Sequence, residues 1–217
     1  MDSKSCFIFG AGEFDGLCLE PGTGDLIIAA DAGLEYLKKL GLRPDVLLGD
    51  FDSLGYIPEG KKIIKYPIMK DDPDMALAVE WAEKQGYNRF FMYGGLGGRI
   101  DHTIGNLQLL AYIARRGMEG YLFGQGFVLT GLCRGSLSFD STFSGDLSVF
   151  CIGKDAHGVT ETGLKYELHD GTLTTDKSLG LSNDFLEKSA FIEVKDGTLL
   201  VIWESHNKSL PLRKYLI

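Results

Sequence analysis

Asp50 and Asp52 stand two residues apart in the stretch LLGDFDSLG, directly behind an apolar run and ahead of a glycine. Neighbouring apolar runs are also followed by charged residues, namely Asp31 after LIIAA, and Lys70, Asp71, Asp72 and Asp74 after KIIKYP. If these runs are parallel strands, their carboxyl ends share one edge of a sheet, where open α/β sheets bind ligands. The spacing therefore predicts a site rich in carboxylates.

Carboxylates crowded at one edge need a partner of opposite charge. Two unit charges ~4 Å apart repel by about 4 kcal/mol at an effective dielectric constant near ~20. A divalent cation offsets this repulsion, and carboxylate oxygens without a cysteine or histidine cluster favour Mg²⁺ over zinc. We therefore interpret Asp50 and Asp52 as metal ligands held on a turn. The alternative is a solvated turn in which Asp52 acts as a cap.

The glycine-rich stretch GGLGGRIDHTIGN, residues 94–106, has the features of a phosphate site. Its four leading glycines allow backbone N–H groups to approach an anion, and the helix expected after them points its positive end at the same place. Arg99 adds a fork of donors suited to phosphate oxygens. Asp101 either caps that helix or reaches a metal, and these two roles compete. The stretch matches neither a P-loop nor a dinucleotide fingerprint.

The apolar runs indicate the elements that carry these residues. Before about residue 124, the runs CFIFG, LIIAA, DVLLG, KIIKYP, FFMYG and GYLFG alternate with helix-period segments. In the longest such segment, helical spacing recurs at Ile104, Leu107, Ala111 and Ala114. Because the apolar residues in these runs are too continuous for one solvated face, they predict strands that are covered on both faces. We expect an α/β domain over 1–124, with an open, mostly parallel sheet and helices on both faces.

After about residue 125 the helical periodicity disappears and turn signals multiply. Asp-Gly pairs stand between strand-like runs in HDGTLT, residues 169–174, and in KDGTLL, residues 195–200. Asp-Gly is the preferred sequence of a two-residue hairpin turn, so each pair predicts a hairpin. We expect a smaller, antiparallel β-sandwich domain over 125–217.

Composition excludes several classes of protein. With 217 residues, 44% of them apolar, the chain is long enough to bury a real core. The net charge of −8 argues against sequence-independent binding to nucleic acid. The four cysteines show no metal-ligand spacing, and we expect reduced thiols. No apolar run approaches ~20 residues and the start has no signal-peptide pattern, so we expect a cytoplasmic protein without a membrane partner.

Together, the motifs resemble those of the thiamine pyrophosphokinase family. The resemblance covers nearly the whole chain, through ADAG at 30–33, GDFDSL at 49–54, KDDPD at 70–74, GGLGGRIDH at 94–102, TGLKYEL at 162–168 and LSND at 181–184. It implies an N-terminal ATP domain and a C-terminal domain for thiamine binding and dimerisation. It also implies a homodimer whose active sites lie where one subunit's α/β domain meets its partner's β-domain. The implied reaction transfers the pyrophosphoryl group of MgATP to the hydroxyl of thiamine, giving AMP and thiamine pyrophosphate.

The same resemblance implies roles for individual residues. Mg²⁺ and the reacting groups would be held by Asp50, Asp52, Asp71 and Asp74, with Asp71 or Asp74 accepting the proton of the attacking hydroxyl. The nucleotide would be contacted by Asp31, Lys70, Gly97, Gly98, Arg99, Asp101 and Asn106. Thiamine would be contacted by Leu164, Ser182 and Asn183.

Some alternatives remain open. The family usually has threonine before the last acid of its KDxTD motif, and Pro73 stands there in this chain. Proline removes a hydroxyl and a backbone donor, which leaves room for another hydroxymethyl substrate such as a pterin. A non-catalytic sensor of thiamine or nucleotide is a further alternative. His102 is the alternative base, although a histidine in the first turn of a helix is more often a surface or capping residue.

Overall fold

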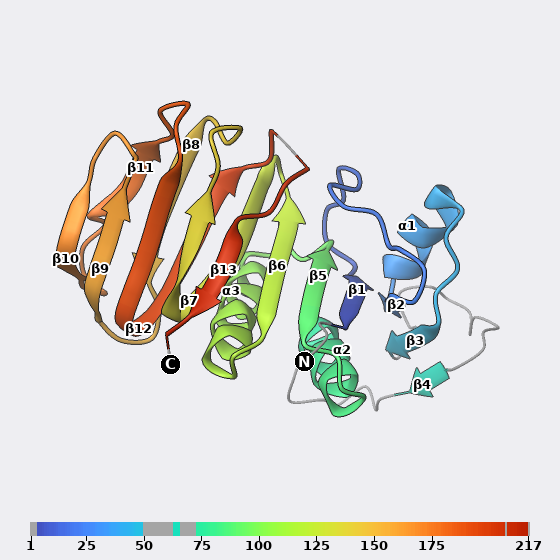
Figure 1. The fold of residues 1–217 in the computed structure, drawn as a ribbon. Helices are drawn as coiled ribbons and strands as arrows, with labels where there is room; N and C mark the ends of the chain where they lie inside the picture. Colours follow the sequence, from blue (N-terminus) through green and yellow to red (C-terminus); the bar gives the residue numbers. More distant parts are fainter. Residues whose placement is uncertain (1–3, 50–62, 66–72, 207, 217) are drawn as a thin grey trace. The chain divides into compact units, whose positions relative to one another are not determined.

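The computed structural model describes residues 4–49, 63–65, 73–206 and 208–216 (Figure 1). Its contacts divide the chain into two compact units. Unit 1 comprises Met1–Leu109 and Gly120–Gln125, and unit 2 comprises Leu110–Glu119 and Gly126–Ile217. No helix in the described ranges is long and apolar enough to cross a membrane.

Unit 1 contains strands in the order β6-β5-β1-β2-β3-β4. Their bounds are β1 Ser5–Phe9, β2 Leu26–Ala30, β3 Val46–Gly49, β4 Ile63–Lys65, β5 Arg89–Tyr93 and β6 Glu119–Gly124. The pairs β1–β2, β1–β5, β2–β3 and β3–β4 are all parallel, as predicted. The residues of β1, β2, β3 and β5 are almost all buried, because their apolar side chains leave no polar side for water. The strand order reverses at β1, which is where sheets of this kind bind ligands.

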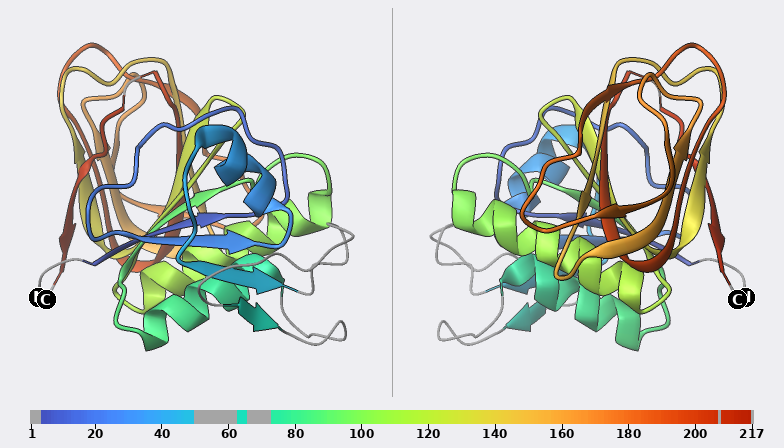
Figure 2. Two further views of the ribbon diagram at one scale, coloured as in Figure 1. Left: turned by 90° about the vertical axis from the view of Figure 1, so that its right-hand side faces the viewer. Right: turned by 90° about the vertical axis from the view of Figure 1, so that its left-hand side faces the viewer.

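Helices α1, Gly33–Leu40, and α2, Asp74–Lys84, both pack on β1 and β2. They approach the sheet from opposite faces (Figure 2). Helix α1 begins directly over the end of β1, because a Cβ on Gly33 would lie 1.8 Å from the carbonyl oxygen of Phe9. Only glycine allows that approach.

Helix α3, Ile100–Arg115, lies in the longest segment with helical spacing. The division between the units falls within it, after Leu109. Its buried positions include Asn106 and Leu110 as well as the predicted Ala111 and Ala114. Ile104, which shares their spacing in the sequence, is 52% exposed.

Unit 2 contains antiparallel strand pairs. The strands are β7 Phe127–Phe139, β8 Asp146–Cys151, β9 Ala156–Thr162, β10 Leu168–Leu173, β11 Gly180–Asp184, β12 Ala190–Glu204 and β13 Leu212–Tyr215. Strand β12 pairs with β7 along its length, and it also pairs with β9 through its first half and with β8 through its second half. The described residues after Gly126 form no helix, which agrees with the loss of helical periodicity.

The two predicted Asp-Gly hairpins are wrong. Asp196 and Gly197 lie inside the continuous strand β12, and Asp170 and Gly171 lie inside β10. Each pair coincides with a register shift, so both are β-bulges. Asp170 has φ 50° and Gly197 has φ 99°, the left-handed region that Asp-Gly also supplies to hairpin turns. The dipeptide signalled the backbone conformation correctly, but a bulge uses that conformation without reversing the chain.

Candidate functional site

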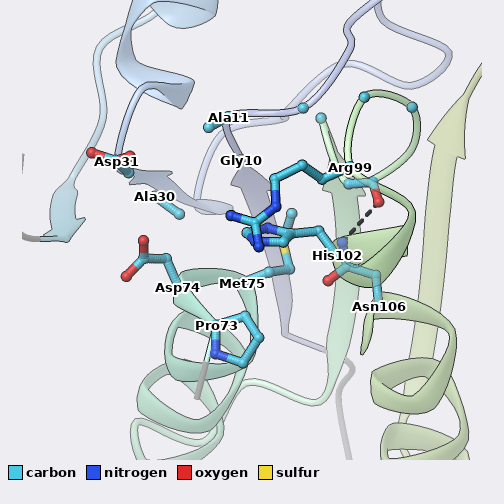
Figure 3. Close-up of a pocket in the computed structure, with 15 residues that line it drawn as sticks. Gly10, Ala11, Ala30, Asp31, Pro73, Asp74, Met75, Arg99, His102 and Asn106 are labelled. Carbon is cyan, nitrogen blue, oxygen red and sulfur yellow. Dashed lines mark hydrogen bonds between the residues drawn. The ribbon is translucent and has the colours of Figure 1, made fainter. Parts of the chain in front are cut away.

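Unit 1 has a cavity of about 330 Å³ where β1, β2 and β5 end (Figure 3). Loops after these strands and the first turns of α2 and α3 surround it. Its lining consists of Gly10, Ala11, Gly12, Ala30, Asp31, Pro73, Asp74, Met75, Gly94, Gly95, Gly97, Gly98, Arg99, His102 and Asn106. Strand ends that are distant in the sequence therefore contribute to one concave site.

The floor of the cavity is built from two glycine loops that are hydrogen-bonded to each other. The N–H of Gly10 donates to the carbonyl oxygen of Tyr93 at 2.8 Å, and the N–H of Gly12 donates to that of Gly94 at 2.8 Å. A Cβ on Gly12 would lie 2.6 Å from the carbonyl oxygen of Gly94. The Tyr36 hydroxyl donates to the carbonyl oxygen of Gly12 at 2.6 Å and so fixes this loop from α1. The close approach leaves no space for side chains there.

Asp31 and Asp74 bring carboxylates to the cavity from β2 and α2 (Figure 3). The N–H of Asp31 donates to the carbonyl oxygen of Leu48 at 2.8 Å, and its backbone has φ 51°. A Cβ on Gly49 would lie 3.2 Å from the Cα of Asp31. Asp31 is thus beside the residue that immediately precedes Asp50. Asp74 is the first residue of α2, because the extended backbone of Pro73 cannot continue the helix backwards.

Four predicted site residues, Asp50, Asp52, Lys70 and Asp71, lie outside the described residues. Of the predicted metal ligands, only Asp74 is described. Within the described part of the chain, no group of three or more His, Cys, Asp or Glu side chains is placed to hold a metal ion. The predicted magnesium set accordingly remains a prediction.

Arg99 lines the cavity from the loop before α3, and its guanidinium is paired with Asp101. Nε and Nη2 of Arg99 donate to the two carboxylate oxygens of Asp101, at 3.1 Å and 2.5 Å. These hydrogen bonds lower the pKa of Asp101 to about 2. Asp101 also accepts the N–H of His102 at 3.1 Å. It is not a lining residue, so its contact is with Arg99 and the start of the helix.

His102 and Asn106 both line the cavity from α3. Asn106 is buried, and its Nδ2 donates to the carbonyl oxygen of Gly95 at 2.7 Å, drawn as a dashed line in Figure 3. That bond holds the glycine loop against α3. The alternative base His102 is therefore placed at the cavity, and its ring is exposed.

The predicted thiamine contacts lie in unit 2, where they differ in exposure. Leu164 and Asn183 are only 2% and 3% exposed, whereas Ser182 is exposed. The Asn183 amide accepts the N–H of Tyr166 at 2.9 Å and donates to the carbonyl oxygen of Tyr166 at 2.7 Å. Asn183 therefore holds the loop around Tyr166 as well as being a candidate for ligand contact.

A second cavity, of about 120 Å³, is lined by Asn183 together with Glu161, Tyr166 and several leucines. Glu161 is buried, and Asn183 Nδ2 lies 3.3 Å from its Oε2. Burial raises the pKa of Glu161 to about 7. Unit 2 thus contains a carboxyl group that is protonated in mildly acidic solution.

Sequence reasoning missed the loop Gly10–Gly12 and Met75 as parts of the first cavity. A signal for the loop was present, because CFIFG ends on Gly10 and Gly12 follows two residues later, in the same way that acids or glycines follow the other apolar runs. Met75 had no signal, since an apolar residue in the first turn of a helix is ordinarily a core residue.

Comparison with known proteins bears on both units. The family description "Thiamin pyrophosphokinase, catalytic domain" matches residues 22–122, and "Thiamin pyrophosphokinase, vitamin B1 binding domain" matches residues 138–199. Thiamine pyrophosphokinase of Bacillus subtilis is 28% identical over 185 residues, covering 82% of this chain and 86% of the relative. Thiamin pyrophosphokinase 1 of Caenorhabditis elegans is 25% identical over 171 residues, covering 73% of this chain and 70% of the relative.

Solved structures agree with these matches. The crystal structure of the Bacillus subtilis thiamine pyrophosphokinase has a TM-score of 0.81 at 25% identity, covering 93% of this chain and 99% of that one. That of the thiamin pyrophosphokinase from Geobacillus thermodenitrificans has a TM-score of 0.79 at 26% identity, covering 92% and 97%. With both family descriptions matched in order, and with relatives aligned over most of their length, this chain belongs to the thiamine pyrophosphokinase family.

Proposed function

We propose that this chain transfers the pyrophosphoryl group of ATP to the hydroxyl of thiamine and releases AMP. The observation that carries the proposal is the cavity of unit 1. It combines carboxylates, glycine loops and an arginine at the ends of parallel strands, and its lining residues from Ala30 to Asn106 lie inside the segment that matches the catalytic domain. Phosphoryl-type transfer depends mainly on positioning and charge neutralisation, and these groups supply both.

In this proposal the two parts of the chain bind different substrates. Residues 1–124 form the ATP-binding catalytic part, and residues 125–217 form a β-sandwich that binds thiamine and makes a homodimer. The match of 138–199 to a vitamin B1 binding domain supports the second assignment. A cytoplasmic location suits an enzyme that uses ATP.

Mg²⁺ is the metal that suits the donor set. Asp31 and Asp74 present hard carboxylate oxygens to the cavity, and no cysteine is among its lining residues. Asp50, Asp52, Asp71 and Asp74 would hold the ion. When bound, Mg²⁺ neutralises charge on the phosphate oxygens.

The chain's own residues position the reacting groups. Arg99 and Lys70 bind phosphate oxygens through charge-assisted hydrogen bonds. The hydroxyl oxygen of thiamine bonds to the β-phosphorus of ATP while the bond from that phosphorus to the bridging oxygen of the α-phosphate breaks, and AMP leaves with that oxygen. Asp71 or Asp74 accepts the hydroxyl proton, so the reaction needs no covalent nucleophile.

The test is AMP release by the full chain with Mg²⁺ and ATP, comparing thiamine with a hydroxymethyl pterin. We expect AMP release that depends on thiamine and is abolished in Asp74→Asn, whose isosteric side chain can neither neutralise a cation nor accept the proton. Release that depends on the pterin would establish the alternative substrate, which the presence of Pro73 in the cavity lining makes worth testing. Binding of thiamine or ATP without turnover would indicate a sensor.

A further inference from the structure

Glu13 lies in the loop after β1 and connects three strand ends of unit 1. Its N–H donates to the carbonyl oxygen of Leu96 at 3.0 Å. One carboxylate oxygen, Oε1, accepts the N–H of Gly98 at 3.2 Å, and the other, Oε2, accepts Nε2 of Gln125 at 3.1 Å. One side chain therefore links the loops that follow β1, β5 and β6.

The glycine turn that Glu13 holds has an unusual backbone conformation. Gly97 has φ 76° and Gly98 has φ 63°, so two consecutive residues adopt the left-handed region. Glycines lose more conformational freedom on ordering than any other residue, which makes such a turn costly to fix in one conformation. A Cβ on Gly97 would lie 2.4 Å from the Cδ of Glu13, so the backbone packs directly against the carboxylate. The carboxylate therefore supports the turn by contact and by hydrogen bonding.

Glu13 holds the turn from outside the cavity. Gly97, Gly98 and Arg99 line the cavity, whereas Glu13 is not among its lining residues. The N–H of Gly98 donates to the Glu13 carboxylate in this structure, although this glycine was expected to contact the nucleotide. Because Arg99 is the next residue in the chain, the conformation of the turn sets the direction in which Arg99 leaves it.

We infer that Glu13 is a positioning residue for the nucleotide, and this inference rests on the proposed function. Its carboxylate fixes the Gly97–Gly98 turn in the conformation that presents Arg99 to the phosphates of ATP. Gln125 is its second anchor, because it restrains the carboxylate from the side of β6.

The test compares Glu13→Ala with Glu13→Gln in the full chain, and Glu20→Ala serves as a matched control because Glu20 is an exposed glutamate of the same segment. Loss of a hydrogen bond to a charged group predicts a rise of about tenfold in KM for ATP in Glu13→Ala, with KM for thiamine unchanged. Glutamine keeps an acceptor for Gly98, so Glu13→Gln restores the wild-type KM to within about threefold. Glu20→Ala behaves as wild type.

A second measurement does not depend on catalysis. Hydrogen exchange at the Gly98 amide, followed without nucleotide, accelerates in Glu13→Ala and Gln125→Ala and stays slow in Glu13→Gln. An unchanged exchange rate in Glu13→Ala overturns the inference, as does tighter ATP binding, which would make the carboxylate a competitor of phosphate. If wild-type protein releases no AMP, the proposed function fails, while the exchange measurement still reports whether Glu13 orders the turn.

Discussion

Arg99 reaches the cavity with its guanidinium already paired to Asp101, and both side chains are exposed. Triphosphate oxygens carry more charge than a single carboxylate and match the same fork of donors. Arg99→Ala should therefore raise KM for ATP by about 10- to 100-fold and leave KM for thiamine nearly unchanged. Steady-state kinetics with each substrate varied in turn measures both constants. Equal increases in the two KM values would contradict the phosphate role.

Asp101→Asn is the matched control for Arg99. Asparagine keeps an acceptor for the N–H of His102 but removes the charge that holds the guanidinium. Because the low pKa of Asp101, about 2, keeps this carboxylate ionised in any ordinary assay, the substitution changes its charge at every working pH. We expect a smaller change in KM for ATP than in Arg99→Ala, since the phosphate-binding fork itself remains.

Glu161 gives unit 2 a dependence of stability on pH. Its folded pKa of about 7 lies above the ordinary value of 4.5, because burial disfavours the charged form. Between these values the folded chain keeps a proton that the unfolded chain releases, so the free energy of unfolding falls as pH rises through that window. The total loss is on the order of 3 kcal/mol.

Glu161→Gln tests whether the free energy of unfolding falls as pH rises because Glu161 loses its proton. Glutamine is neutral at every pH, so urea unfolding should give the variant and the wild type similar free energies below about pH 4.5 and a more stable variant above about pH 7. The difference between the two proteins should grow through the window between these values. A constant difference across that range would exclude titration of Glu161 as its source.

At the scale of elements, alanine substitution of two helix glycines, Gly33 and Gly105, should change stability in opposite directions. A Cβ at Gly33 would lie 1.8 Å from the carbonyl oxygen of Phe9, so Gly33→Ala must separate α1 from β1. We expect a loss of about 1–3 kcal/mol or more, measured as the free energy of unfolding. Gly105 in α3 has its nearest contact at 4.0 Å, so Gly105→Ala should instead stabilise by about 0.5–1 kcal/mol. Destabilisation of similar size in both variants would refute the steric explanation.

Elements of unit 1 could be predicted well because each strand contains a short run of mostly apolar residues, and a glycine or an acid stands close behind most of these runs. LIIAA, for example, coincides with β2, Leu26–Ala30. Spacing alone did not identify the buried face of α3, because Ile104 and Ala111 share one period but differ in what covers them. The Asp-Gly pairs failed because φ at Gly197 is a local property, whereas the partner of a strand is set by distant residues. Local signals predicted conformation, and tertiary pairing decided its use.

In the candidate site, too, local sequence signals could be read in advance and contacts between distant residues could not. Asp31, Asp74 and the glycine loop before Arg99 were identified because ligands bind at the carboxyl ends of parallel strands, and all of them line the cavity. Glu13 could not be predicted, because its contact with Gly98 joins residues that are 85 positions apart in the sequence. Nothing near EFDG in the sequence indicates that contact.

At the scale of the whole molecule, the proposed reaction needs groups from both matched segments of the chain. The carboxylates and Arg99 belong to the segment that matches the catalytic domain, and Ser182 belongs to the segment that matches the vitamin B1 binding domain. In a homodimer with twofold symmetry, a site built from both segments can be completed within one subunit or across the interface. These two arrangements predict different behaviour when defective subunits are mixed.

Mixing Asp74→Asn with Ser182→Arg, each inactive alone, distinguishes the arrangements. Ser182 is exposed, so arginine there can block thiamine without disturbing the core. After full subunit exchange, about half of the dimers are mixed, and a site shared across the interface leaves one intact site in each of them. We therefore expect about a quarter of wild-type AMP release, because about half the dimers each retain half their sites. If each site lies within one subunit, every mixed dimer has two broken sites, and activity stays absent even when differently tagged subunits are shown to co-purify.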